Sequence, residues 1–308
     1  MGFALALLAL VLYSANLLVT KVASGSMDLD VGVTVAAFSN VVVGVGFFGL
    51  QVASGHSPLA IEAWAVALFL VSGVFSTYLG RWFFFATVAR LGAARASAFQ
   101  ITNPLFTVVI AWIFLGERLR LLDLGAVAVT LTGLYLVSYV AEPAAESSRG
   151  SGWRQALAAG RRTVLHSGAV VALLSASSYA VANVLRGAAV RRWNEPILGG
   201  VLGAAVGMAA QVLATAKGRD LWGEVARAPR RALTLYGLIG LITISAQVSM
   251  IAAMSTIPVG VTNLITMSTP ILVTPASYFL LKNQEGLRPR TVLGMAIVLI
   301  GVGTLILR

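Results

Sequence analysis

Residues 2–20 read GFALALLALVLYSANLLVT, an apolar run that contains no charged side chain. A helix that crosses the hydrocarbon core of a bilayer uses roughly 20 such residues, because each residue adds only about 1.5 Å along the axis. A signal peptide would show a basic segment before such a run and a small-residue cleavage site after it, and this stretch shows neither feature. We therefore predict a first membrane-spanning helix.

The composition of the whole chain extends this prediction. Of the 308 residues, 58% are hydrophobic and 11% are charged, whereas an ordinary soluble domain carries about 25% charged residues. The mean hydropathy is +0.89. Ten helical spans would use about 200 residues and leave only short connections, so a sizeable soluble domain is excluded.

Nine further apolar stretches follow the first. They lie at about 31–53, 62–90, 96–115, 121–140, 163–190, 196–216, 231–255, 259–281 and 291–307. Between the fifth and sixth spans the composition becomes polar and charged. We predict an all-α integral membrane protein with ten transmembrane helices, in which a first five-helix repeat (1–140) and a second (163–308) flank a linker (141–162).

The two predicted halves echo each other. Matching residues recur 166 or 167 positions apart: Tyr13 and Tyr179, Asn16 and Asn183, Pro104 and Pro270. Because each half holds an odd number of spans, the second must be inverted relative to the first, as is common in secondary transporters. The pattern predicts alternating access around a site between the halves.

A local motif adds a family resemblance. Residues 90–96 read RLGAARA, Asn103-Pro104 follows, and residues 115–119 read LGERL. This series is similar to the signature of the drug/metabolite transporter superfamily, EamA-type permeases. The second half departs from it, with KNQEG at 282–286 and IPVG at 257–260. The resemblance implies a ten-helix carrier for small metabolites, in a family whose members move amino acids, nucleosides, sugar conjugates or cationic drugs.

The net charge of +11 is informative about orientation. Of the 22 lysines and arginines, fifteen fall in the odd-numbered connections, six (Arg186 among them) fall in the even-numbered connections or at the termini, and Arg81 lies within a span. The positive-inside rule places the fifteen in the cytoplasm and both termini outside. The family resemblance implies both termini inside, so both orientations stay open. Either way, the charge does not call for a nucleic-acid partner.

Arg81 is the leading candidate for substrate binding. It lies nine residues before Arg90, or roughly 13 Å along the helix axis. An arginine at that depth is costly unless it faces a cavity or a partner. Its planar guanidinium group can form two parallel hydrogen bonds to a carboxylate or a phosphate. The alternative is an arginine that extends to the membrane interface. Tyr78 and Trp82 are predicted to form an aromatic wall beside it.

Other polar residues within the spans complete the predicted site. They are Tyr13, Asn16, Gln100, Asn103, Tyr179, Asn183, Gln247 and Asn263. The alternative is that the amides join helices, each contributing about 1 kcal/mol to packing. Pro104 and Pro270 are predicted hinges or kinks, because proline interrupts helical hydrogen bonding. The small-xxx-small spacing of Gly199, Gly203 and Gly207 predicts a close helix contact.

Several classes of function find no support in the sequence. The chain has no cysteine and two histidines, so no metal centre is expected. All eleven acids fall at predicted helix ends or in loops, with Glu62 the doubtful case, which disfavours cation/proton antiport. Neither a phosphate-binding loop nor a catalytic constellation is recognisable. We therefore expect no enzyme and no cofactor.

The leading hypothesis is a secondary transporter, an exporter or exchanger, for a small polar metabolite such as an amino acid or organic anion. It would act by alternating access in the bacterial inner membrane, with the lipid bilayer and the substrate as its partners. A coupling ion and a monomeric or homodimeric state stay open. The alternatives are export of apolar or cationic compounds, and a lipid-handling membrane protein without solute flux.

Overall fold

The computed structural model describes residues 1–23, 25–55, 60–91, 99–117, 120–138, 168–215, 220–280 and 289–307, and these residues form helices and short connections. The predicted linker (141–162) and the motif residues 92–96 lie outside the described residues. The helices are α1 (Gly2–Ala23), α2 (Leu29–Ala53), α3 (Ala63–Gly73), η1 (Val74–Gly80), α4 (Arg81–Leu91), α6 (Asn103–Leu115), α7 (Leu121–Ser138), α9 (Gly168–Arg192), α10 (Pro196–Thr215), α11 (Leu221–Arg227), α12 (Arg230–Met254), α13 (Val259–Met267), α14 (Pro270–Leu280) and α15 (Pro289–Ile306).

Within the described part, seven helical runs are long and apolar enough to cross a bilayer: Gly2–Ala23, Asp30–Ala53, Ala63–Phe84, Gly168–Arg192, Pro196–Leu213, Arg230–Met254 and Val259–Ala276. Shorter apolar helices lie at Asn103–Leu115, Leu121–Leu136 and Val292–Ile306. Large apolar side chains such as Trp112 and Phe114 are exposed, as a surface against lipid requires. The chain is a multi-pass, helical membrane protein, and the count of ten spans stays a prediction.

The third predicted span is one helical run with a change of geometry in its middle. α3 leads into the π-helical segment η1, and α4 begins directly afterwards at Arg81. π-helical turns hold more residues than α-helical turns and occur frequently at functional sites. The segment therefore changes which side chains share a face of this run.

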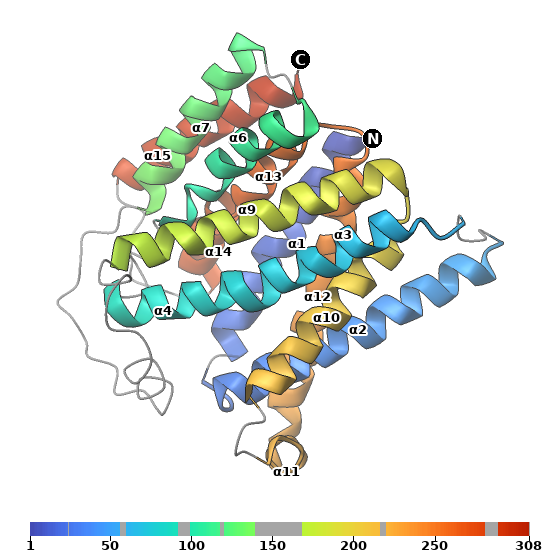
Figure 1. The fold of residues 1–308 in the computed structure, drawn as a ribbon. Coiled ribbons are helices and arrows are strands. Elements are labelled where there is room, and N and C mark those ends of the chain that lie inside the picture. Colours follow the sequence, from blue (N-terminus) through green and yellow to red (C-terminus); the bar gives the residue numbers. More distant parts are fainter. Residues whose placement is uncertain are drawn as a thin grey trace.

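Helices from the two halves of the chain pack against each other (Figure 1). α7 lies beside α15, α1 and α2 pack on α12, α2 packs on α10, and α9 packs along α3, η1 and α4. Both chain termini lie at the same end of the bundle. The predicted glycine contact is confirmed where α10 meets α3, because a Cβ on Gly73 would lie 2.4 Å from the carbonyl oxygen of Gly203.

The two predicted hinge prolines begin helices. Pro104 lies in the first turn of α6, after a turn at residues 101–102, and Pro270 is the first residue of α14. Proline suits the first helical turn because its missing N–H would have no partner there. Each proline thus marks a break between helical segments rather than a kink within one helix, and a hinge role stays a prediction.

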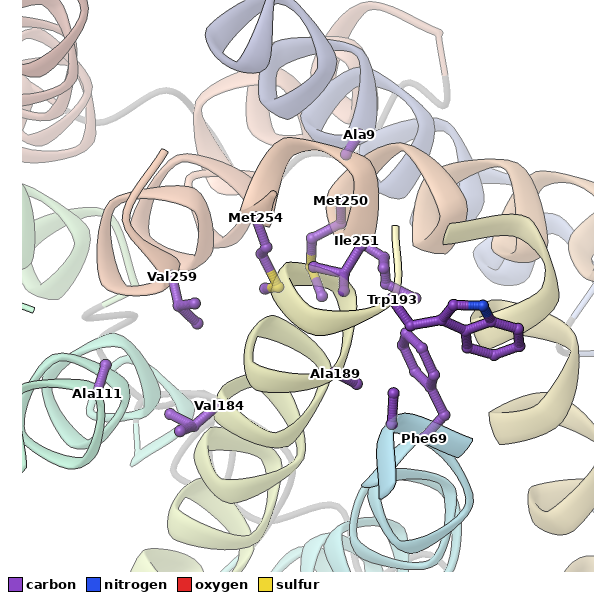
Figure 2. Packing of buried hydrophobic residues seen from close by; sticks show 12 residues of the cluster. Ala9, Phe69, Ala111, Val184, Ala189, Trp193, Met250, Ile251, Met254 and Val259 are labelled. Carbon is purple, nitrogen blue, oxygen red and sulfur yellow. The ribbon is translucent and has the colours of Figure 1, made fainter. Parts of the chain in front are cut away.

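A cluster of buried apolar residues, which we call the apolar plug, joins one end of the bundle. It consists of Ala9, Ala65, Phe69, Ala111, Val184, Ala189, Val190, Trp193, Met250, Ile251, Met254 and Val259. Figure 2 shows Met250 and Met254 of α12 directed toward α9. The rings of Phe69 and Trp193 lie 6.4 Å apart. The plug closes the space between these helices at that end.

Candidate functional site

A cavity of about 510 Å³ lies between helices of both halves, a size typical of small-molecule sites. Its polar lining comes from α1, α2, η1, α4, α6, α9 and α12. These residues are Tyr13, Asn16, Thr20, Asn40, Ser76, Thr77, Arg81, Asn103, Tyr179, Asn183, Arg186, Tyr236, Thr243 and Gln247. Met208, Met250 and Met267 belong to its apolar lining. Among the described residues that line it, none is acidic.

Seven of the eleven sequence-predicted binding residues line this cavity. They are Tyr13, Asn16, Arg81, Asn103, Tyr179, Asn183 and Gln247. Tyr78 and Trp82 do not line it and are 41% and 37% exposed. In an α-helix, residues three positions apart share a face, but Tyr78 lies in η1, where that register does not hold. The expected aromatic wall beside Arg81 is therefore not formed by these two residues.

The two remaining predicted residues do not belong to the cavity lining, and both make hydrogen bonds to other side chains. Gln100 donates to Ser175 Oγ at 2.7 Å. Asn263 is fully buried and donates to Asn103 Oδ1 at 2.7 Å, while Asn183 donates to Asn263 Oδ1 at 3.0 Å. Asn263 thus joins two cavity-lining amides from opposite halves of the chain, which is the helix-joining alternative considered for it.

Arg81 lines the cavity from the first turn of α4. Its side chain is partly buried, and its Nη1 atom is buried without a hydrogen-bond partner in the described part of the chain. A buried donor without a partner costs about 1–3 kcal/mol, more for a charged group. The guanidinium also interacts electrostatically with the Tyr179 hydroxyl. Arg81 therefore faces the cavity, and its Nη1 donor is available to a ligand.

Arg186 is a second arginine in the cavity. It falls inside the predicted span 163–190, and its assignment to a connection in the charge count is wrong. It lies within α9, is 6% exposed, and its Nη2 donates to Ser76 Oγ at 2.9 Å. The available signal was the spacing of Tyr179, Asn183 and Arg186, which places them on one helical face. Moving Arg186 into a span leaves the charge bias between loops in the same direction.

The comparisons with known proteins agree with this architecture. The model of the EamA-like transporter family matches residues 1–139 and 166–307. The chain belongs to the EamA-like transporter family. A solved structure titled only "Crystal structure of protein" has a TM-score of 0.71 at 16% identity, covering 99% of this chain and 96% of that chain. At that identity the likeness supports the fold alone. No curated protein matches the chain.

In this EamA-like transporter, part of the family-like motif forms a clamp at the end of the bundle that carries the apolar plug. Gly116 ends α6 with a φ of 64°, a conformation that glycine adopts readily. Glu117 then accepts from the Val259 backbone N–H at 2.8 Å and pairs with Arg191. Arg191 Nε also donates to the Met254 carbonyl at 3.3 Å. One carboxylate thereby joins the ends of α6, α9 and α13.

The acids of this transporter that the structure describes lie at helix ends, in connections or in the short α11. Glu62, the doubtful case, accepts from the Ala65 N–H at the start of α3. Asp28 caps α2 and Asp220 caps α11 in the same way. Carboxylates at helix N-termini satisfy free N–H groups and complement the helix dipole. These acids stabilise helix ends, and none of them lines the cavity.

Proposed function

We propose that this protein is a secondary transporter, an exporter or exchanger, that moves a small polar metabolite across the bacterial inner membrane by alternating access. The observation that carries the proposal is the polar cavity between the two halves of a helical bundle that is closed at one end by an apolar plug. A carrier of this kind needs a central site and a closure that can form on either side of it.

The positions of cavity and plug along each helix support an inverted repeat. In α1, Ala9 belongs to the plug, and Tyr13 and Asn16 line the cavity further toward the carboxyl end. In α9 the order is reversed, because Tyr179 lines the cavity and Trp193 beyond the carboxyl end of the helix belongs to the plug. Helices α1 and α9 therefore run in opposite directions between the same two regions.

The third helices of the two halves repeat this reversal. In the first half, Phe69 of α3 belongs to the plug and Arg81, further along, lines the cavity. In the second half, Gln247 of α12 lines the cavity and Met254, further along, belongs to the plug. Two helix pairs thus show the relation that two inverted five-helix repeats would produce, which supports the proposed ten-span organisation.

The chain permits a direct test of alternating access because it contains no cysteine. Single cysteines replace Ala37, which lines the cavity, and Ala189, which lies in the plug. In membranes that hold the protein in a single orientation, a small membrane-impermeant thiol reagent should label Ala37→Cys and leave Ala189→Cys unlabelled. Transported substrate should raise labelling at Ala189→Cys, because the plug must open during the cycle. Labelling at the two positions that never changes with substrate would contradict alternating access.

Flux is tested on purified protein in liposomes with a labelled panel of amino acids, organic anions, nucleosides and cationic compounds. Uptake or counterflow of polar metabolites is the expected result. If no member of the panel moves, the transport proposal fails. Lipid movement without solute flux would instead indicate the lipid-handling function.

A further inference from the structure

The charged residues that line the cavity, among those the structure describes, are all positive. Arg81 and Arg186 both line it, and no Asp or Glu does so among the described residues. The hydrogen bond of Arg186 goes to a neutral hydroxyl, that of Ser76, and Arg81 Nη1 has no partner in the described part of the chain. Removing charges from water is costly unless they are paired. The cavity therefore holds two guanidinium groups whose natural counter-charge is a ligand.

Both arginines belong to the same wall of the cavity. Arg81 begins α4 and Arg186 lies in α9, and these two helices pack directly on each other. Both guanidinium groups lie in the electrostatic surroundings of the Tyr179 hydroxyl in α9, and Arg186 has the Tyr13 hydroxyl of α1 as a second such neighbour. The two positive charges therefore lie on neighbouring helices that both line the cavity.

The opposite wall is neutral. Shifting by the repeat distance of 166 residues relates Arg81 to Gln247 in α12, and Arg186 to Thr20 in α1. Both of these residues line the cavity as well. On this wall Asn16 donates to Thr243 Oγ1 at 2.8 Å, so its polar groups satisfy one another without charge. Two repeat-related walls thus differ by two positive charges.

The geometry points to a small organic anion without a cationic group as the substrate. Its carboxylate or phosphate group lies between Arg81 and Arg186, and its neutral part faces α1 and α12. An amino acid fits less well, because its ammonium group would meet two guanidinium groups and no carboxylate. A cationic compound fits least. This inference rests on the proposed function and narrows its substrate class.

Probes of matched length separate these classes. Succinate, 4-aminobutanoate, 1,4-diaminobutane and 1,4-butanediol share a four-carbon chain and differ in charge. Phenylpyruvate, phenylalanine and phenethylamine form a ring-bearing set, and glycerol 3-phosphate tests phosphate against carboxylate. Binding to the full-length detergent-purified protein is measured by thermal stabilisation and calorimetry. We expect stabilisation by anions of at least one of these chemistries, and weaker or no stabilisation by the zwitterion, cation and diol of equal length.

Variants assign the effect to the two arginines. Arg81→Gln and Arg186→Gln should each weaken anion binding about 10- to 100-fold, as loss of a charge-assisted hydrogen bond predicts. Arg186→Lys should also weaken it, because a lysine lacks the planar fork. Arg192→Gln is the matched control, since Arg192 is exposed at the end of α9. Where Arg186→Gln fails to fold, the less buried Arg81 carries the test.

The outcomes distinguish this inference from the proposed function. If anions bind but no flux is seen in liposomes, the anion site is supported and the transport proposal fails. If flux occurs and zwitterions or cations compete as well as their anionic counterparts, the transport proposal is supported and the anion preference is overturned. Anion binding that is unchanged in both Arg→Gln variants, or no stabilisation by any anion of the panel, also overturns it.

Discussion

Replacing Glu117 by alanine should destabilise the plug end of the bundle more than replacing a residue that pairs with it, such as Arg191. The Glu117 side chain is 8% exposed, and that of Arg191 is 32% exposed. Glu117 accepts from the backbone N–H of Val259 at 2.8 Å, at the start of α13, and pairs with Arg191 in the last turn of α9. The substitution would leave both donors without their acceptor.

The magnitude follows from these contacts. A hydrogen bond to a charged group contributes about 1.5–3 kcal/mol. Breaking a fully buried ion pair costs about 3–5 kcal/mol, and the partial exposure of Arg191 reduces that figure. We expect Glu117→Ala to lower the free energy of unfolding by about 2–4 kcal/mol, which corresponds to a fall in Tm of roughly 4–8 °C. Arg191→Met should cost less, about 1 kcal/mol, because Glu117 keeps its backbone donor.

The assay is thermal unfolding of the purified variants in one detergent, followed by tryptophan fluorescence. A double-mutant cycle with Glu117→Ala and Arg191→Met isolates the energy of the pair, and Arg192→Met serves as a control at the neighbouring exposed arginine. Glu117→Gln keeps one acceptor oxygen for the Val259 N–H and should fall between wild type and Glu117→Ala. A Tm for Glu117→Ala within 1 °C of wild type, or strictly additive single losses, would refute the clamp.

Three further predictions test the packing and the orientation. Asn263→Leu should lower the free energy of unfolding by about 1–3 kcal/mol, because Asn183 and Asn103 would lose a buried partner; a thermal midpoint equal to wild type would contradict the network. Gly73→Ala should cost about 1–3 kcal/mol through overpacking against the Gly203 backbone, measurable as a lower midpoint, whereas an unchanged midpoint would show that α3 and α10 can separate freely. A reporter fused after Arg308 should be active only outside the cytoplasm if the charge bias between loops sets the topology, and cytoplasmic activity would favour the family orientation instead.

The apolar runs predicted where the helices lie, because burial in lipid imposes a long, uncharged stretch on each of them. The spacing of Tyr13 with Asn16, and of Tyr179 with Asn183, identified cavity-lining residues because polar side chains within a span tend to face the bundle interior. Tyr78 could not be placed in this way. Its orientation depends on the π-helical segment η1, and that departure from α-helical geometry left no recognisable period in the sequence.

Arg186 shows a second limit of reading charge along a sequence. Basic residues near a predicted span end are ordinarily interfacial, and counting by loops treats them alike. The hydroxyl that accepts from Arg186 is Ser76, which is 110 residues away in sequence. A buried arginine is recognisable only through such a long-range partner or through its place on a helical face with other polar residues. The helical-face criterion was available here, in the shared face of Tyr179, Asn183 and Arg186.

An inverted repeat gives a carrier two walls that are alike in backbone, and the side chains then decide how they differ. Here the asparagines at 16 and 183 both make hydrogen bonds to other helices, so this position maintains the framework in each half. The repeat-related pairs Arg81 with Gln247 and Thr20 with Arg186 differ in charge. Exchanging the members of both pairs would move the two charges to the α1–α12 wall. If the cavity selects substrate by charge rather than by shape, the exchanged protein should still prefer anions.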